Sequence, residues 1–104
     1  MVYICSPYSG NTRLNTANAR RYCRYAVDKG CIPLAPHLLF PQFMNEETER
    51  ETAMFMNYVL LTKCRELWVF GRTITTGMSE EIEKAKQRKI YIRYFTEEIK
   101  EVND

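Results

Sequence analysis

Four short apolar segments alternate with longer segments of helical periodicity, and this alternation is the feature that most restricts the fold. The apolar segments are rich in β-branched and aromatic residues, as buried strands are: VYIC (2–5), CIPL (31–34), ELWVF (66–70) and IYIRYF (90–95). Strands that alternate with helices form right-handed βαβ units around a parallel sheet. We therefore predict an α/β fold, a small doubly wound (flavodoxin- or Rossmann-like) sheet of four parallel strands in the order 2-1-3-4, with helices on both faces.

Three helices are expected between these strands. Apolar residues over 13–29 recur at the i, i+3, i+4, i+7 spacing of an amphipathic helix, and Gly30 stands where a C-terminal cap belongs. The second helix is expected over 48–63, because it opens with TERE, the capping-box pattern of Thr followed three residues later by Glu. A third helix is expected over 76–88. The segment 96–102 is expected to be a short final helix or a tail.

Length and composition predict one ordinary globular domain, residues 1–104. The chain is 45% hydrophobic and 27% charged, which is typical of folded domains rather than disordered or fibrous chains. No apolar run approaches the roughly 20 residues that span a bilayer, and the N-terminus lacks the features of a signal peptide. We therefore expect a cytoplasmic protein without a membrane partner. The net charge of +2 is too small to indicate a nucleic-acid polymer as partner.

The cysteines do not form a recognisable metal or disulfide pattern. Cys5, Cys23, Cys31 and Cys64 are scattered, no C-x-x-C pair occurs, and the chain has a single histidine. This spacing argues against a zinc site and against a disulfide framework. We predict reduced, partly buried thiols and no metal.

The predicted topology places two polar loops at one edge of the sheet. In doubly wound sheets, ligands bind at the carboxyl ends of the strands, where the chain reverses direction across the sheet. The loops that follow the first and third strands meet at this point, and they read SPYSGNTRLN (6–15) and GRTITTGMSEE (71–81). Both are rich in small and hydroxylated residues and lead into a helix. We therefore expect a ligand-binding cleft between them.

Among the glutamates of the third helix, only Glu81 is placed to reach this cleft. At 100° per residue, Glu80 and Glu83 fall on the outer side of the helix, whereas Glu81 lies about 60° from the centre of the apolar stripe. Its alternative role is that of a partly exposed glutamate that interacts with the helix dipole. The positions expected to face the core are Met78, Ile82, Ala85 and Lys89, the last through its aliphatic stem.

The first loop offers a cradle for a phosphate or a sugar hydroxyl. Its side chains and backbone N–H groups lie at a helix start, yet the chain contains neither a P-loop nor a G-x-G-x-x-G motif, and a simple hydrogen-bonded turn with an N-cap is the alternative. Tyr8 could stack on a base or lie against the surface, Arg13 could pair with a phosphate or lie in solvent, and His37 follows the second strand beside the cleft. The candidate cradle residues are Ser6, Ser9, Gly10 and Asn11.

Four motifs together resemble a known group of proteins: VYICSPYSG, GxIPLAPHLLFPQF, ELWVFG and IxxGMxxEIxxA. They are similar to a small domain family of unknown function found in bacterial and phage genomes. That family is related to the nucleoside 2-deoxyribosyltransferases and the deoxynucleoside 5′-phosphate N-hydrolases. The resemblance covers nearly the whole chain.

The resemblance implies a reaction at the N-glycosidic bond of a nucleoside or nucleotide. Glu81 and Ala85 match the catalytic glutamate and the alanine four residues after it, so Glu81 would attack C1′, expel the base and form a glycosyl ester that water or a second base resolves. It further implies no cofactor, a homo-oligomer (a dimer or higher), and a histidine, His37, that closes the pocket. The substrate-binding residues implied are Ser6, Tyr8, Ser9, Gly10, Asn11, Gly77, Met78 and Ser79.

The sequence also departs from the transferases, which hold or protonate the leaving base with aspartates near the third strand. Here Arg65 precedes Glu66, GRTITTG contains no acid, and Glu83 replaces a glycine. Two alternatives therefore remain: a non-catalytic sensor that binds a nucleotide in the same cleft, and an oligomeric accessory protein that uses the apolar segment HLLFPQFM (37–44) as an interface. The base, the sugar, the need for a 5′-phosphate and the choice between hydrolase and transferase stay open.

Overall fold

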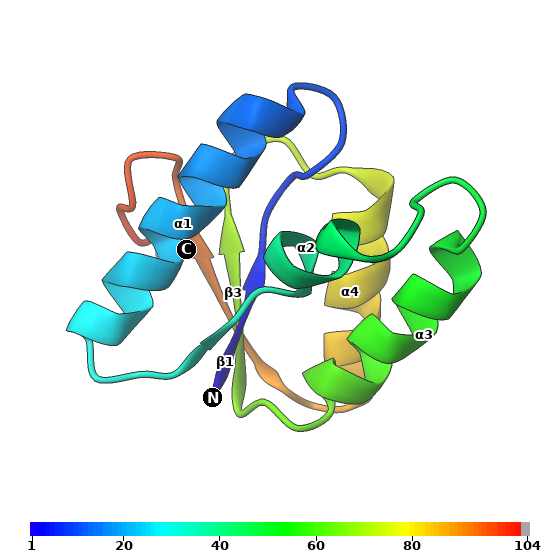
Figure 1. The fold of residues 1–104 in the computed structure, drawn as a ribbon. Helices are drawn as coiled ribbons and strands as arrows, with labels where there is room; N and C mark the ends of the chain where they lie inside the picture. Colours follow the sequence, from blue (N-terminus) through cyan, green and yellow to red (C-terminus); the bar gives the residue numbers. More distant parts are fainter. Residues whose placement is uncertain (103–104) are drawn as a thin grey trace.

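The computed structural model describes residues 1–102 and confirms the predicted sheet (Figure 1). Its four strands are β1 (Val2–Cys5), β2 (Pro33–Leu34), β3 (Glu66–Phe70) and β4 (Tyr91–Phe95). They lie in the order β2-β1-β3-β4, and every neighbouring pair is parallel. The short strand β2 lies at an edge, as proline within a strand requires.

Helices cover both faces of the sheet (Figure 1). The helices are α1 (Thr12–Asp28), α2 (Pro36–Leu39), α3 (Arg50–Leu61) and α4 (Thr76–Gln87), with a 3₁₀ turn, η1 (Phe40–Gln42), after α2. Helix α1 packs on one face, and α3 and α4 pack on the other. The connection after β2, which reads as neither a clean helix nor a polar loop, is therefore built from two short helical turns.

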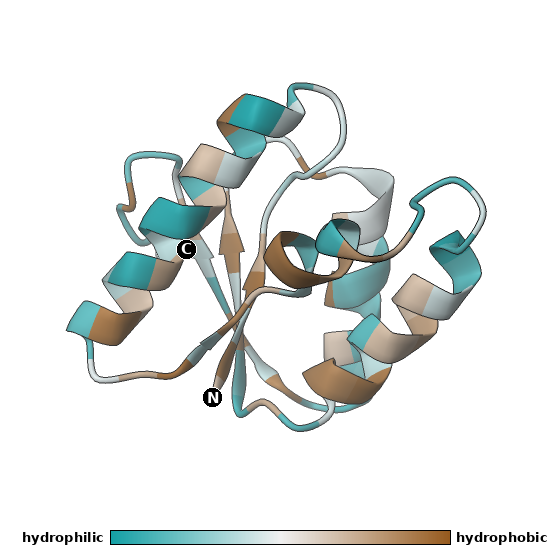
Figure 2. Cartoon of the chain, in the orientation of Figure 1, coloured by the Kyte–Doolittle hydropathy of each residue, from teal (hydrophilic) through white to brown (hydrophobic). Residues whose placement is uncertain are grey.

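The period-two alternation of the strands divides the core into two layers. Tyr3 and Cys5 of β1 face α4, whereas Val2 and Ile4 face α1. Strand β1 and most of β3 are accordingly buried, while the outer face of α1 is hydrophilic (Figure 2). The layer on the α4 side comprises Tyr3, Cys5, Leu61, Cys64, Leu67, Val69, Met78, Ile82 and Ala85. The layer on the α1 side comprises Val2, Ile4, Tyr22, Ala26, Trp68, Phe70 and Phe95.

The second helix does not begin at Thr48, so its predicted start is wrong. Helix α3 begins at Arg50, and its N-cap, Glu49, makes no side-chain capping hydrogen bond. The reciprocal pattern lies one turn earlier instead. The side-chain oxygen of Asn45 accepts from the N–H of Glu47 at 2.9 Å and of Thr48 at 3.1 Å, and the Glu49 carboxylate accepts from the N–H of Asn45 at 2.9 Å. Asn is at least as good a capping residue as Thr. The reciprocal hydrogen bonds therefore form between Asn45 and Glu49, and not between Thr48 and Glu51 as the TERE pattern predicts.

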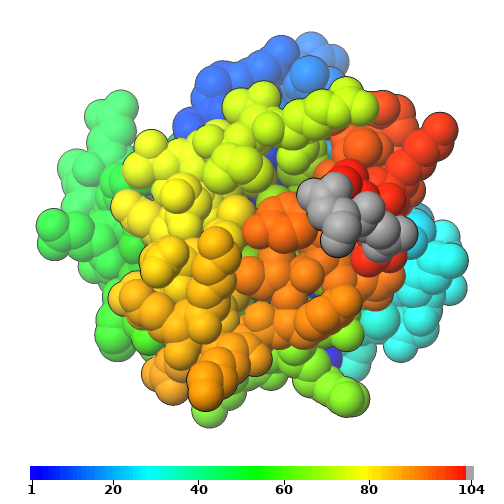
Figure 3. Space-filling model, turned by 180° about the vertical axis from the view of Figure 1, so that it is seen from behind, coloured from blue at the N-terminus to red at the C-terminus, as the bar shows by residue number. Residues whose placement is uncertain are grey.

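The prediction for Lys89 also needs correction. Lys89 does not cover the core: it is exposed, lies beyond α4 and has a φ of 57°. The N–H of Ile90 bonds the Ala85 carbonyl at 2.9 Å, so the chain has already turned back toward the sheet. Of the two alternatives for the segment 96–102, a short helix or a tail, the helix does not form: the segment contains a turn, and its Glu101 forms an antiparallel bridge with Phe95. Seen from behind, this segment lies beside β4, at the side opposite α4 (Figure 3).

The structure bears on three of the predicted properties: the membrane span, the thiols and the exposure of the apolar segment 37–44. Within residues 1–102, no helix is long and apolar enough to cross a membrane. All four cysteines are free, and Cys5 and Cys64 are buried. Leu39 and Phe43 of the segment 37–44 are 46% and 66% exposed. The homo-oligomer and the cytoplasmic location stay predictions.

Candidate active site

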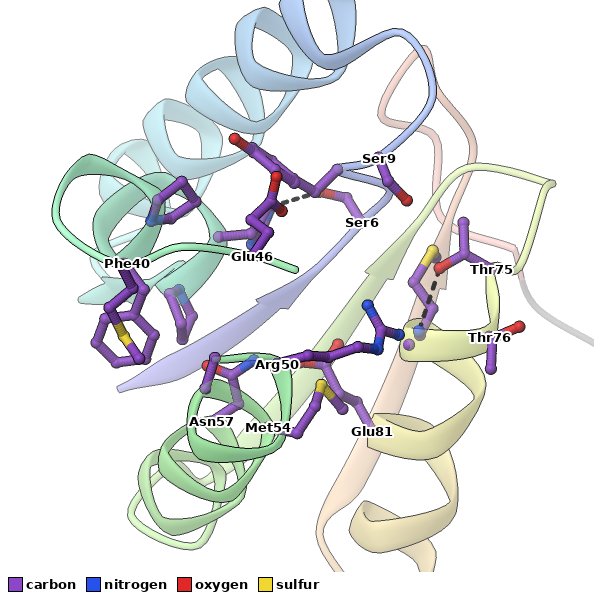
Figure 4. Close-up of a pocket in the computed structure, with 18 of the residues that line it drawn as sticks. Ser6, Ser9, Phe40, Glu46, Arg50, Met54, Asn57, Thr75, Thr76 and Glu81 are labelled. Carbon is purple, nitrogen blue, oxygen red and sulfur yellow. Dashed lines mark hydrogen bonds between the residues drawn. The ribbon is translucent and has the colours of Figure 1, made fainter. Parts of the chain in front are cut away.

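A cavity of about 530 Å³ opens at the carboxyl ends of β1 and β3 (Figure 4). The loops after these two strands both contribute to it, as the predicted topology requires. The segment after β2 and one face of α3 complete the wall. Its lining residues are Ser6, Tyr8, Ser9, Pro36, His37, Phe40, Pro41, Met44, Asn45, Glu46, Arg50, Ala53, Met54, Asn57, Thr75, Thr76, Gly77, Met78 and Glu81.

Glu81 lies at the wall of this cavity, half-buried between α4 and the sheet. Its Oε2 accepts a short hydrogen bond from the hydroxyl of Tyr3. The pair forms because Tyr3 occupies a strand position that faces α4, and Glu81 borders the apolar stripe of that helix. The carboxylate is therefore fixed by the protein core and exposed to the cavity at the same time.

Burial changes the protonation of Glu81. Loss of solvent around the carboxyl raises its pKa from the ordinary 4.5 to about 7. Hydrogen bonds from Tyr3 and Cys5 lower the pKa, and the nearby charge of Glu80 raises it, but both effects are smaller than that of burial. At neutral pH the carboxyl is thus present in both forms. A pKa close to the working pH is typical of a group that takes part in chemistry, although structural carboxylates also show it.

His37 and Ser6 form a second pair at the cavity wall. The Nε2 of His37 and the Oγ of Ser6 are 2.9 Å apart, and this contact ties α2 to the end of β1. Burial lowers the pKa of His37 to about 4, so the ring is neutral at pH 7. His37 is therefore suited to accept or donate a hydrogen bond in the cavity rather than to supply a proton as a cation.

The first loop divides into residues that line the cavity and residues that shape the loop. Tyr8 and Ser9 line the cavity. Asn11 instead caps α1, since its side chain accepts from the N–H of Leu14 at 3.1 Å. Arg13 is exposed in the first turn of α1, outside the lining. Gly10 also lies outside it, in a turn where its φ of 94° favours glycine.

The start of α4 supplies backbone and small side chains to the cavity. Gly77 and Met78 line it, whereas Ser79 is exposed on the outer side of the helix. The hydroxyl of Thr75 accepts from the N–H of Met78 at 3.2 Å and so caps the helix. Of the candidate residues named from the sequence, the structure thus brings seven together: Ser6, Tyr8, Ser9, His37, Gly77, Met78 and Glu81.

Sequence reasoning missed the contribution of α3. Arg50, Met54 and Asn57 lie along one face of this helix and line the cavity (Figure 4). The buried Oδ1 of Asn57 has no hydrogen-bond partner within the described chain. An unpaired buried acceptor is costly for the fold. Tyr3 was missed as well, although the strand alternation could have placed its hydroxyl on the α4 side.

The site offers no cluster suited to a metal. Within residues 1–102, no three His, Cys, Asp or Glu side chains are grouped to hold an ion. The polar groups of the cavity are instead hydroxyls, backbone amides, one guanidinium, one neutral imidazole and the carboxyls of Glu46 and Glu81. Such a set suits a polyhydroxylated organic ligand that is bound through hydrogen bonds.

Comparison with known proteins agrees with this architecture. The structure is similar to that of a 2-deoxyribosyltransferase from the psychrotolerant bacterium Bacillus psychrosaccharolyticus, with a TM-score of 0.68 at 16% identity over 99% of this chain and 76% of that chain. A likeness at this identity establishes a shared fold. No curated protein sequence matches the chain. Residues 1–95 match the model of a domain of unknown function (DUF7768), and the chain therefore belongs to this family of unknown function, as its motifs predicted.

Proposed function

We propose that this protein cleaves or transfers at the N-glycosidic bond of a nucleoside or nucleotide, with Glu81 as the nucleophile. The observation that carries the proposal is the Glu81 carboxyl itself, which is held by Tyr3 at the wall of a hydroxyl-rich cavity and has a pKa of about 7. The fold shared with a 2-deoxyribosyltransferase supports this choice.

The first step is a displacement at the anomeric carbon. A carboxylate oxygen of Glu81 attacks C1′, the C1′–N bond breaks, and its electron pair leaves with the base. The product is a glycosyl ester on Glu81. Water then attacks C1′ and releases the sugar, or a second base attacks and forms a new nucleoside. The hydrogen bond from Tyr3 holds the carboxylate in one orientation for the attack.

The leaving base needs a proton, and GRTITTG lacks the aspartates that supply one in the transferases. Glu46 lies on the wall opposite Glu81 (Figure 4) and is the other carboxyl of the cavity lining. We assign the base to the Glu46 side of the cavity, where a water molecule held by this side chain protonates the base as it leaves. His37 does not fill this role, because it is already neutral at pH 7.

Chromatography of free base tests the proposal. The protein is incubated with the common nucleosides, 2′-deoxynucleosides and their 5′-monophosphates, with and without a second base. Free base from at least one substrate, or a new nucleoside when the second base is present, is the expected result. If no base is released across the whole panel while a nucleotide still binds, the non-catalytic sensor becomes the better description.

Replacing Tyr3 by Phe is expected to shift the pH profile of base release toward alkaline pH. The hydrogen bond from Tyr3 lowers the pKa of Glu81, so its loss raises that pKa further, by about one unit. Only the ionised carboxylate attacks, so activity falls more at pH 6 than at pH 9. The measurement is kcat/KM against pH for both proteins.

The shift separates a positioning role of Tyr3 from a merely structural one. Phe preserves the ring that packs in the core beside Cys5 and Met78, so loss of packing alone would lower activity equally at every pH. A variant with reduced activity but an unchanged acid limb would show that Tyr3 does not act through Glu81.

A further inference from the structure

Helix α3 is only partly covered by the rest of the chain. It lies at the margin of the molecule and packs chiefly against α4 (Figure 1). Of its 12 residues only Leu61 is buried. Its exposed side carries Phe55 and Val59, whose exposed fractions are 67% and 42%. Two large apolar side chains on the open side of a helix are typical of a surface that a partner covers.

The exposed residues of α3 form a straight stripe, which we call the α3 stripe. At 100° per residue, every fourth residue advances by only about 40° around the helix axis, so four residues fall within a sector of about 120°. These residues are exposed, and they are Glu51, Phe55, Val59 and Lys63. Lys63 continues the last turn of the helix, since its N–H bonds the Leu60 carbonyl at 3.0 Å. The stripe thus has an acid at one end, a base at the other and two apolar residues between them.

The order of these residues makes the α3 stripe complementary to itself. In a pair with two-fold symmetry, residue i contacts residue j of the other copy and j contacts i. If two α3 helices pair antiparallel about position 57, Glu51 faces Lys63 of the second copy. The same axis brings Phe55 opposite Val59, because both pairs are centred on position 57. A parallel pair would instead place like charges together at each end, so the charges select the antiparallel arrangement.

Both end charges of the α3 stripe are free to meet a second copy. Within residues 1–102, Glu51 and Lys63 make no ion pair; the residues that do are Asp28, Glu66, Glu97, Glu98, Glu101, Arg24, Arg72 and Arg93. Thr52 and Thr62 are also centred on position 57 and stand beside the end charges. The symmetry of the pattern therefore extends to the small polar residues at its ends.

We propose that α3 is a self-association surface, on which a second copy of this chain pairs antiparallel through the α3 stripe. The pairing does not depend on the reaction proposed for Glu81. It places the interface on α3 rather than on the segment 37–44, which exposes Leu39 and Phe43 but contains no Asp, Glu, Lys or Arg to set a register. One helix pair of this length is a small interface, so a dimer with a roughly micromolar Kd is expected. Because the other side of α3 lines the cavity, pairing also holds that wall in place.

Sedimentation equilibrium of the whole chain tests the surface, at protein concentrations from about 5 to about 500 μM. The wild type is expected to move from the mass of one chain toward twice that mass as the concentration rises. Phe55→Ser removes the largest apolar contact of the α3 stripe and raises the dimer Kd by at least about 10-fold. Phe43→Ser makes the same change at a phenylalanine that is equally exposed, 66% against 67%, and leaves the Kd unchanged.

An exchange of the end charges tests the antiparallel register. Glu51→Lys alone and Lys63→Glu alone each place like charges opposite one another at both ends of the pair, and each raises the Kd by about 10-fold. An equimolar mixture of the two variants restores opposite charges at both ends, so a mixed dimer forms with a Kd close to that of the wild type. Each substitution also opposes the helix dipole, but a loss of helix stability would persist in the mixture. Glu47→Lys and Lys86→Glu change exposed charges away from the α3 stripe and leave the Kd unchanged.

Three results would overturn the proposed pairing. A chain that stays monomeric at every concentration has no such surface. A dimer that Phe43→Ser weakens and Phe55→Ser does not is built on the segment 37–44 instead. A mixture of the two charge variants that associates no better than either variant alone excludes the antiparallel register. None of these measurements uses a substrate, so a failure here leaves the proposed function standing, and a failure to release base leaves the pairing standing.

Discussion

Glu81→Gln is expected to abolish base release and to lower kcat/KM by at least about three orders of magnitude, as the loss of a nucleophile does in other enzymes. An amide oxygen does not form the glycosyl ester. The Gln side chain has nearly the same volume as Glu and still accepts a hydrogen bond from the hydroxyl of Tyr3, so the shape of the cavity is preserved. Initial rates measured by chromatography at pH 8, where a carboxyl with a pKa of about 7 is mostly ionised, check this expectation.

Two further variants separate the nucleophile from a general effect of charge. Glu83→Gln makes the same chemical change on the exposed side of α4, away from the lining, and should leave the rate unchanged. Glu81→Asp keeps the charge but withdraws it by one methylene, and a displacement of this size costs about 100-fold. If Glu81→Gln retains a rate of the same order as the wild type, Glu81 binds the substrate but does not attack it.

The sheet and the place of Glu81 were predictable because each rests on a local pattern. Four apolar segments separated by helical ones leave few arrangements of a parallel sheet, and the structure has the expected order β2-β1-β3-β4. The position of Glu81 at the border of an apolar stripe follows from helical geometry, since Met78, Ile82 and Ala85 do face the core. Local periodicity determines which way such a side chain points.

The other walls of the cavity depend on tertiary packing that no local pattern encodes. Helix α3 carries apolar residues around most of its circumference, from Met54 and Phe55 to Val59 and Leu61. Without a single stripe, its rotation, and with it the direction of Arg50 and Asn57, is set only when it docks against α4. The pairing of Tyr3 with Glu81 likewise joins residues 78 positions apart. Such contacts become visible only in the folded chain.

The same Glu81→Gln variant is expected to be more stable than the wild type at alkaline pH, by up to about 3 kcal/mol. In the folded state the pKa of Glu81 is raised to about 7, against an ordinary 4.5. A raised folded pKa favours the protonated native state, so the associated stability is present below pH 4.5 and is lost as the pH rises through 7. Gln does not ionise, and it therefore avoids this loss.

Urea unfolding at pH 4.5, 6 and 9 measures the effect without any substrate. The difference in unfolding free energy between Glu81→Gln and the wild type should grow between pH 4.5 and 7 and stay constant above, while Glu83→Gln follows the wild type throughout. A difference that does not change with pH would show that Glu81 is ionised normally and that burial does not perturb it. If Glu81→Gln has a larger unfolding free energy at alkaline pH and releases no base, Glu81 lowers the stability of the fold and is needed for the reaction.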